Sequence, residues 1–305
     1  MLLRQLEYLV ALARARHFAR AAQACFVSQP ALSEGIRKLE DELGVPLVRR
    51  ERKFEGLTPE GERVVVWAQR ILADRDAMRD DIQALRSGVT GRLRIGTVPT
   101  ASTAVSVLTQ PFCVANPLAT VLVYTDLRAE DILRRLQTYE LDAALTYRPP
   151  SADADFKFVP LYRERYVFLT TGPVDAHPAG IEWEEAAGYP LCLLHPMMQG
   201  RQVLDAVFAE LGTKVAPRVE TDSIASLFAH VRTGQWASIV SHAWLHVFGI
   251  PAGMRVIPLA GPSRTAAVGL LLPPREPVSV LGQALLDVVG RVSVADVLES
   301  LPESS

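Results

Sequence analysis

An apolar stripe at helical spacing stands near the start of the chain. Its members fall at i, i+4, i+7 and i+11, which places them on one helical face and predicts their burial: Leu32, Ile36, Leu39 and Leu43. A second, polar face contains Gln29, Ser33 and Arg37, one turn apart. Ser28 suits an N-cap and Gly44 suits a C-terminal stop. The pattern therefore predicts an amphipathic helix whose two ends are encoded locally.

A shorter helix is predicted just upstream. Phe18, Ala21, Ala22 and Cys25 repeat the helical spacing, and residues 25–27 leave room only for a tight turn. Two helices joined in this way form a helix-turn-helix, whose second helix enters the major groove by its N-terminal end. The polar tip of the downstream helix suits that task, because Gln pairs with adenine and Ser contacts bases or phosphates. The alternative is a helical pair inside an ordinary core.

A charged run follows the second helix. Arg49, Arg50, Arg52 and Lys53 precede Gly56 in a segment short enough to be a wing. Such a run is usually a solvated surface, but beside a helix-turn-helix it favours contact with DNA phosphates. Residues 1–57 carry 10 basic and 7 acidic residues, a net charge of +3, whereas the whole chain carries −2. The surplus is small, so we expect tight binding to depend on dimerisation.

A long helix is predicted over residues 58–88, with Thr58 as N-cap and Pro59 in the first turn. One apolar stripe runs along it, interrupted by Arg75, and its members are Val64, Trp67, Ile71, Met78, Ile82 and Leu85. About thirty residues at ~1.5 Å each give a rod of about 45 Å, longer than one small domain needs. We expect the rod to dimerise; the alternative is that it lies on its own domain.

The pattern changes after the small-residue segment 87–91 to short β-rich runs separated by helices. Strands are predicted over 93–98, 121–125, 143–147, 166–171, 190–194, 238–241 and 266–272, with helices over 130–139, 201–211 and 223–233. This alternation predicts an α/β fold with a largely parallel sheet. Residues 89–305 carry 17 basic and 21 acidic residues, which argues against a nonspecific architectural DNA-binding protein.

From Leu3 to Arg94 the chain resembles the LysR-type transcriptional regulators, and the resemblance continues more weakly to about Leu301. The matching segments are residues 6–10, 18–22, 27–33, Ile36, 39–40, 43–44, Leu47, Arg50 and 57–61. The resemblance implies an all-α winged helix-turn-helix DNA-binding domain (1–57), a linker and dimerisation helix (58–88) and an effector-binding α/β domain (89–305). The last would have two lobes like a periplasmic solute-binding protein, lobe I being about 92–161 and 268–301 and lobe II about 162–267.

The resemblance and the charged run together predict contacts with double-stranded promoter DNA. The predicted DNA-binding residues are Ser28, Gln29, Pro30, Ser33, Arg37, Lys38, Arg50, Arg52 and Lys53. Two departures stand out: Val48 replaces a usual aromatic, and Glu34 occupies a position that touches DNA in many relatives, where it could accept from cytosine or repel phosphate. The resemblance further implies a dimer, assembled as a dimer of dimers (a homotetramer), with RNA polymerase as a further partner.

A small-molecule effector is expected in a cleft between the lobes, beyond the carboxyl ends of the strands. The predicted effector-binding residues are Thr100, Ala101, Ser102, Arg128, Met197, Met198, Gln199 and Ser223. Each hydroxyl could equally be an ordinary N-cap. Ala129 stands where relatives usually have Ser or Thr, and Arg128 favours an anionic effector such as a carboxylate unless it faces solvent.

One branch of the resembling family senses peroxide with a cysteine in the loop after the strand predicted over 190–194. Here that loop carries Met197 and Met198, and Cys192 lies within the apolar strand, where it is expected to pack as a small hydrophobe. A thiol switch is therefore disfavoured. The alternative to a bound effector is a redox-responsive regulator that uses oxidation of these methionines or of cysteine.

An enzyme is the rival class. The tightest histidine pair, His242 and His246, is spaced i, i+4 and could bind zinc with a third ligand, but Trp244 and Leu245 between them indicate packing. No nucleophile elbow, Walker loop or dinucleotide motif occurs, so we expect no enzyme, metal or cofactor. The start lacks a signal-peptide pattern, no apolar stretch reaches spanning length and the 3 cysteines are scattered, which predicts a cytoplasmic protein without membrane contact.

Overall fold

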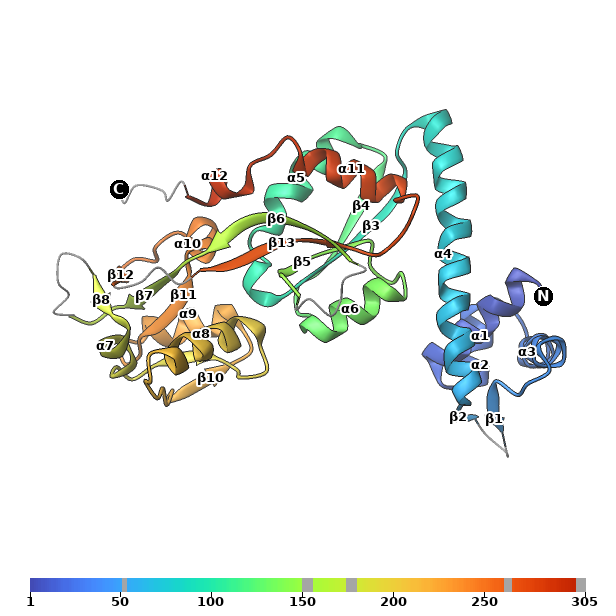
Figure 1. Ribbon diagram of the computed structural model, residues 1–305, viewed down its shortest axis with the longest axis horizontal. Helices are drawn as coiled ribbons and strands as arrows, with labels where there is room; N and C mark the ends of the chain where they lie inside the picture. The colour runs from blue at the N-terminus through green and yellow to red at the C-terminus, as the bar shows by residue number, and fades with distance from the viewer. Residues whose placement is uncertain (51–53, 150–155, 174–179, 261–264, 300–305) are drawn as a thin grey trace. The chain divides into compact units, whose positions relative to one another are not determined.

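The computed structural model describes residues 1–50, 54–149, 156–173, 180–260 and 265–299 (Figure 1). The chain divides into two compact units, Met1–Ser87 and Gly88–Ser305. Each unit has its own hydrophobic core, so each is described by itself. Across the described ranges, no helix is both long enough and apolar enough to cross a membrane.

The described residues of the N-terminal unit form four helices and a two-stranded hairpin. Their bounds are α1 (Leu3–Ala15), α2 (Phe18–Ala24), α3 (Gln29–Leu43), β1 (Val48–Arg50), β2 (Phe54–Leu57) and α4 (Pro59–Ser87). α2 and α3 form the predicted helix-turn-helix, and the antiparallel β1–β2 hairpin stands in the position of the predicted wing. This winged helix-turn-helix with a long helix behind it confirms the expected fold of the N-terminal part.

The ends of α3 follow the sequence signals. The Oγ of Ser28 accepts a hydrogen bond from the backbone N–H of Ala31 at 3.3 Å, and Gly44 adopts φ = 70°, which ends the helix without a Cβ clash. Leu32, Ile36 and Leu39 are buried, as the stripe predicts. The prediction for the fourth member was wrong, because Leu43 lies in the last turn and is 41% exposed.

Two side chains fix the hairpin to the helices. Oε1 of Glu40 accepts hydrogen bonds from the backbone N–H groups of Leu47 and Val48 at 2.9 and 3.0 Å. Oγ1 of Thr58 accepts from the N–H of Gly61 at 2.9 Å and donates to the carbonyl of Pro46 at 2.7 Å. The wing is therefore held at a defined place beside α3.

α4 is one helix of 29 residues with two different environments along its length (Figure 1). Near its N-terminus Val65 and Ala68 are buried in the core of the unit, and Val64 and Ile71 pack against that core. The other stripe positions are exposed: Trp67, Met78, Ile82 and Leu85. The predicted single stripe therefore divides into residues that serve the domain's own core and residues that leave an apolar surface uncovered in this chain.

The second unit has two lobes. The first holds a five-stranded sheet in the order β4-β3-β5-β13-β6, with bounds β3 (Gly91–Thr97), β4 (Ala119–Tyr124), β5 (Ala143–Tyr147), β6 (Lys157–Glu164) and β13 (Ala266–Leu272). Its helical elements are η1 (Pro99–Ala101), α5 (Val105–Ala115), α6 (Ala129–Gln137), α11 (Val280–Val289) and α12 (Val294–Glu299). One buried core joins this sheet to its helices.

The second lobe holds a four-stranded sheet in the order β11-β7-β12-β8 and a parallel pair β10-β9. The strands are β7 (Tyr166–Thr170), β8 (Ile181–Glu182), β9 (Cys192–Leu194), β10 (Val219–Thr221), β11 (Ser238–Ser241) and β12 (Arg255–Ala260). The helices are α7 (Trp183–Ala187), α8 (Gln199–Glu210), α9 (Ile224–Arg232) and α10 (His242–Phe248). The two lobes confirm the expected α/β two-lobed architecture.

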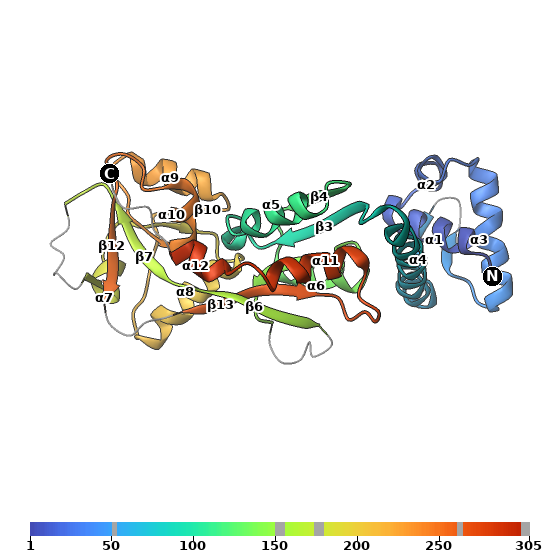
Figure 2. The same ribbon diagram turned by 90° about the horizontal axis from the view of Figure 1, so that it is seen from above.

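The prediction of a largely parallel sheet was wrong. β13 is antiparallel to both of its neighbours, β5 and β6, and β7 is antiparallel to β11 and β12. The reason is the route of the chain: β6 leads out of the first lobe and β13 returns into it, so the two crossing segments pair in opposite directions. Figure 2 shows these strands side by side where they pass between the lobes.

Candidate functional site

The tip of α3 presents a polar surface. Gln29 and Pro30 of the first turn are exposed, as are Ser28 before it and Lys38 further along, whereas Ser33 is half-buried. The N-terminal N–H groups and the helix dipole at this tip favour phosphate. The surface has the composition of the predicted DNA-binding face, and the contacts themselves stay a prediction.

Glu34 organises the cations of this face. Its carboxylate takes two hydrogen bonds from Arg37, Nε to Oε2 at 3.0 Å and Nη2 to Oε1 at 2.9 Å, and Lys38 lies 3.8 Å away. Arg37 also reaches Asp41 at 3.4 Å. The hydrogen bond from Arg37 lowers the pKa of Glu34. The predicted DNA-contacting arginine is therefore held by its own helix in the free protein, a relationship that the spacing i, i+3 could have indicated.

The wing is described only in part. Nε of Arg49 donates to the carbonyl of Leu57 at 2.9 Å, so this side chain links the two strands of the hairpin. Arg50 lies in β1, where the structure describes its backbone alone, and Arg52 and Lys53 lie outside the described residues. The wing contacts therefore stay a prediction.

A pocket of about 540 Å³ opens between the two lobes of the second unit. One side comes from the first lobe, with Val98 and Pro99 after β3 and residues 126–129 after β4. The other side comes from the second lobe, with His195 and residues 197–199 after β9 and residues 220–222 at the end of β10. This volume suits a small molecule.

Four of the eight predicted effector residues line this pocket: Arg128, Met197, Met198 and Gln199. The other four do not line it. Ala101 is buried, Ser102 donates to the carbonyl of Pro99 at 2.7 Å, and the Oγ of Ser223 caps α9 by accepting from Ser226. Thr100 is buried, with its Oγ1 at 2.9 Å from the phenol oxygen of Tyr147. These hydroxyls serve the fold.

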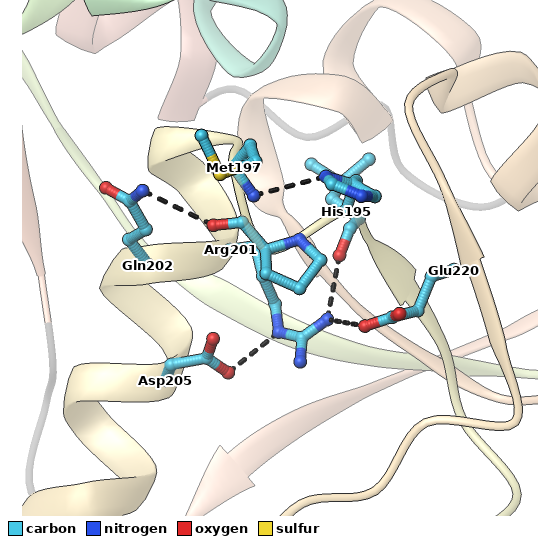
Figure 3. A network of polar contacts seen from close by, with 8 residues as sticks. His195, Met197, Arg201, Gln202, Asp205 and Glu220 are labelled. Atoms are coloured by element: carbon cyan, nitrogen blue, oxygen red, sulfur yellow. Dashed lines mark hydrogen bonds and ion pairs between the residues drawn. The ribbon is translucent and has the colours of Figure 1, made fainter.

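Sequence reasoning missed three polar residues that line the pocket, namely Asp126, His195 and Glu220, whereas the segment 221–223 was expected to face the same gap and its Thr221 and Asp222 do line it. Glu220 extends from β10 toward the buried guanidinium of Arg201 on α8, whose Nη1 donates to Glu220 Oε1 at 2.9 Å and to the carbonyl of Leu194 at 2.8 Å (Figure 3). Nε of Arg201 donates to Asp205 at 2.7 Å. Burial alone would lower the pKa of Arg201, but these carboxylates outweigh it and raise the pKa. The network fixes the second-lobe wall of the pocket.

A buried carboxylate lies where the chain crosses between the lobes. Tyr147 of β5 donates to Oε2 of Glu164 at 2.5 Å, and Tyr166 of β7 donates to the same oxygen at 2.9 Å. The indole Nε1 of Trp244 on α10 donates to the carbonyl of Thr100 at 2.9 Å, a further link between the lobes. Burial raises the pKa of Glu164, although its hydrogen bonds act in the opposite direction.

The cysteines lie away from the pocket lining. Cys192 is buried in β9, and burial raises its pKa to about 11, so its thiol is poorly suited to attack an oxidant. Cys25 is half-buried with a raised pKa, chiefly through burial, and Cys113 is exposed on α5. The sulfur atoms in the pocket lining therefore belong to Met197 and Met198.

Of the two histidines considered as a zinc site, His242 and His246, the first has a structural role. Nδ1 of His242 lies 3.1 Å from the backbone N–H of Arg165, which donates to it, and its ring packs edge-on against Tyr162. Within the described part of the chain, no cluster of three or more His, Cys, Asp or Glu side chains is arranged to hold a metal ion.

Two family models match the chain. The model described as "LysR substrate binding domain" matches residues 86–293, and the one described as "Bacterial regulatory helix-turn-helix protein, lysR family" matches residues 3–62. The chain belongs to the LysR family of bacterial regulators. It is therefore a DNA-binding transcription regulator with an effector-binding domain, and members of this family are regulators and not enzymes.

Relatives within the LysR family are similar over most of the chain. A "Hydrogen peroxide-inducible genes activator" of Haemophilus influenzae is 29% identical over 288 residues, which cover 91% of this chain and 92% of the relative. A full-length OxyR variant from Pseudomonas aeruginosa has a TM-score of 0.77 at 29% identity, covering 97% of both chains. The LysR family regulator CbnR, solved with its target DNA, has a TM-score of 0.67 at 20% identity, covering 95% of this chain and 99% of that one.

Proposed function

We propose that this LysR-type regulator binds promoter DNA sequence-specifically as a homo-oligomer and that the pocket between its lobes controls this binding. The observation that carries the proposal is the origin of the pocket walls, since Arg128 comes from one lobe and Met198 from the other. A change in what the pocket holds alters the contact between the lobes. A signal that favours one lobe arrangement then shifts the population of the assembly that fits the promoter.

The proposed dimer forms through α4. Trp67, Met78, Ile82 and Leu85 leave an apolar surface on a helix that extends well beyond its own domain's core. Pairing of two such helices would bring two recognition helices to successive major grooves about 34 Å apart. A tetramer, as a dimer of dimers, and RNA polymerase as a partner follow from the family resemblance.

An oxidant is the first candidate signal, because several relatives are named hydrogen peroxide-inducible genes activators, and the one from Haemophilus influenzae is similar over 91% of this chain. The pocket lining contains methionine and no cysteine, so the reaction falls to Met197, which is 49% exposed, and to Met198. In this reaction the thioether sulfur takes one oxygen from hydrogen peroxide, giving methionine sulfoxide and water. The polar sulfoxide would alter packing between the lobes.

Reversible binding of a small effector is the second candidate. The observation that favours it is the set of charged groups around about 540 Å³ of pocket, namely Asp126, Arg128, Glu220 and Asp222. Peroxide is far smaller than this space and has no charge for these groups to recognise.

Footprinting on a promoter fragment selected by the protein separates the candidates. Peroxide should change the footprint of the wild type and of a cysteine-free variant (Cys25→Ser, Cys113→Ser, Cys192→Ala), but not of Met197→Leu with Met198→Leu. Loss of the response in the cysteine-free variant would assign it to a thiol. If peroxide changes none of the footprints, the oxidant candidate is wrong.

A further inference from the structure

The charges around the pocket are predominantly negative. Asp126 follows β4 in the first lobe, while Glu220 and Asp222 lie at the end of β10 in the second. One guanidinium, that of Arg128, shares the lining with them, together with the imidazole of His195. Sequence reasoning from Arg128 alone pointed to an anion, and the remaining lining does not fit an anion alone.

The negative charge of Glu220 is balanced by a buried arginine of its own lobe. The buried guanidinium of Arg201 contacts it at 2.9 Å and is itself shared with Asp205. Asp126 and Asp222 differ, because neither forms a hydrogen bond or an ion pair with another described residue. Two carboxylates from opposite lobes therefore face the same space with no cation of the protein bonded to them.

A closure of the lobes that brought such carboxylates together would cost free energy unless a cation lay between them. An ammonium or guanidinium group supplies both the charge and the N–H donors that carboxylates accept. A purely anionic molecule would be attracted to Arg128 but repelled by the two carboxylates. The charge arrangement therefore favours a ligand with a positive group.

The remaining lining suits a short carbon chain and a negative end. Arg128 is the N-cap residue of α6, and its charge acts on Asp131 in the first turn of that helix, so it lies beside a helix N-terminus. Met197, Met198 and Val98 offer apolar contacts, and Gln199 can donate or accept a hydrogen bond. Amino and carboxylate ends would thus meet different residues of the lining.

We propose that the pocket binds a small zwitterion of the amino-acid type, with its amine or guanidinium against Asp126 and Asp222 and its carboxylate toward Arg128. The inference rests on the proposed function, which makes this pocket the place where the signal acts. It names the chemical class of the effector and predicts that lobe closure depends on the positive group.

The test is calorimetric titration of the full-length protein with three matched probe groups. The zwitterions are L-ornithine, L-lysine and L-arginine, the diacids are glutarate and adipate, and the diamine is 1,5-diaminopentane. At least one zwitterion should bind with a Kd at least about tenfold below that of both diacids, and Asp126→Asn with Asp222→Asn should weaken it at least about tenfold. Tighter binding of a diacid, or no binding of any zwitterion, would overturn the inference.

A matched control removes two negative charges elsewhere. Glu184 and Glu185 are exposed on α7 and do not line the pocket, so Glu184→Gln with Glu185→Gln should leave the affinity for the zwitterion unchanged. An equal loss in this control would also contradict the inference, because general electrostatics would then explain the effect.

Footprints with the same probes separate this inference from the proposed function. If a zwitterion binds through Asp126 and Asp222 but leaves promoter binding unchanged, the ligand class stands and control by the pocket fails. If a diacid or peroxide changes promoter binding through pocket residues while zwitterions do not bind, control by the pocket stands and the ligand class fails.

Discussion

The phenol of Tyr147 donates a 2.5 Å hydrogen bond to Oε2 of Glu164, at the point where β6 leaves the first lobe. Tyr166, the first residue of β7, donates to the same oxygen from the second lobe at 2.9 Å. One buried carboxylate thus joins both lobes beside the crossing. Because the chain passes from the first lobe to the second here, we expect the protonation and geometry of the Glu164 carboxyl group to affect both stability and lobe closure.

Glu164→Gln should flatten the pH dependence of stability. Burial raises the pKa of Glu164, so the folded state holds this proton more tightly than the unfolded chain. Its stabilising contribution is complete below the ordinary glutamate pKa of about 4.3 and is lost as the pH rises through the raised value. Tm measured against pH should therefore fall more steeply for the wild type than for the variant above about pH 4.3. Parallel curves would contradict this account.

Gly200→Ala should force the lobes apart. A Cβ at Gly200 on α8 would lie 2.3 Å from Cγ2 of Thr100 in the first lobe. Overpacking of this kind costs about 1–3 kcal/mol, which urea unfolding of the purified protein would measure. Thr100→Ser is the matched control, because it removes Cγ2 and keeps the hydroxyl beside Tyr147. The double variant should recover most of the loss, and no recovery would show that another contact limits the space.

Glu34→Gln should strengthen nonspecific DNA binding. Its carboxylate holds Arg37 by two hydrogen bonds and lies near Lys38, so its removal releases cations for phosphate. Each additional phosphate contact steepens the slope of log K against log salt by about 0.9, which fluorescence anisotropy over a salt series measures. Glu62→Gln, an equal change of charge on the exposed side of α4, is the control. The account would be wrong if both variants behaved alike.

Met78→Asp with Ile82→Asp should convert the protein to monomers. Met78 is 60% exposed and Ile82 is 54% exposed on the part of α4 that extends past its domain core. Charges there would have to be buried unpaired in a helix pair. Sedimentation velocity measures the result, with Arg79→Asp and Gln83→Asp on a neighbouring face of α4 as the control. Persistence of the wild-type oligomer in the stripe variant would place the interface elsewhere.

Local signals predicted the helix-turn-helix and several strands. Ser28 and Gly44 encode the ends of α3, and the short β-rich runs of β5, β11 and β13 stand within the predicted bounds. Strand direction was not predictable in this way, since β13 pairs with β6 through residues as distant as Ala266 and Glu164. β6 itself was missed, because Pro160 and the charges at its ends obscure the strand pattern.

The pocket between the lobes was predicted in part for a related reason. The position after a strand correctly indicated Arg128 and the loop at Met197, because that rule depends on local order along the chain. Whether a hydroxyl faces the pocket depends on distant neighbours: Thr100 is covered by Tyr147 and Gly200. Asp126 and Glu220 line the same pocket only once the lobes are folded together, so no local pattern indicated their shared environment.

Footprinting of the full-length protein on genomic fragments that it selects from a competing random pool tests the central claim most directly. We predict protection of two half-sites whose centres lie about 34 Å, or a multiple of it, apart. Gln29→Ala with Arg37→Ala should lose this protection while keeping the wild-type oligomer and Tm, and pocket variants should keep protection but lose its response to the signal. Equal protection of random DNA, or an unchanged footprint after substitution of Gln29 and Arg37, would contradict the account.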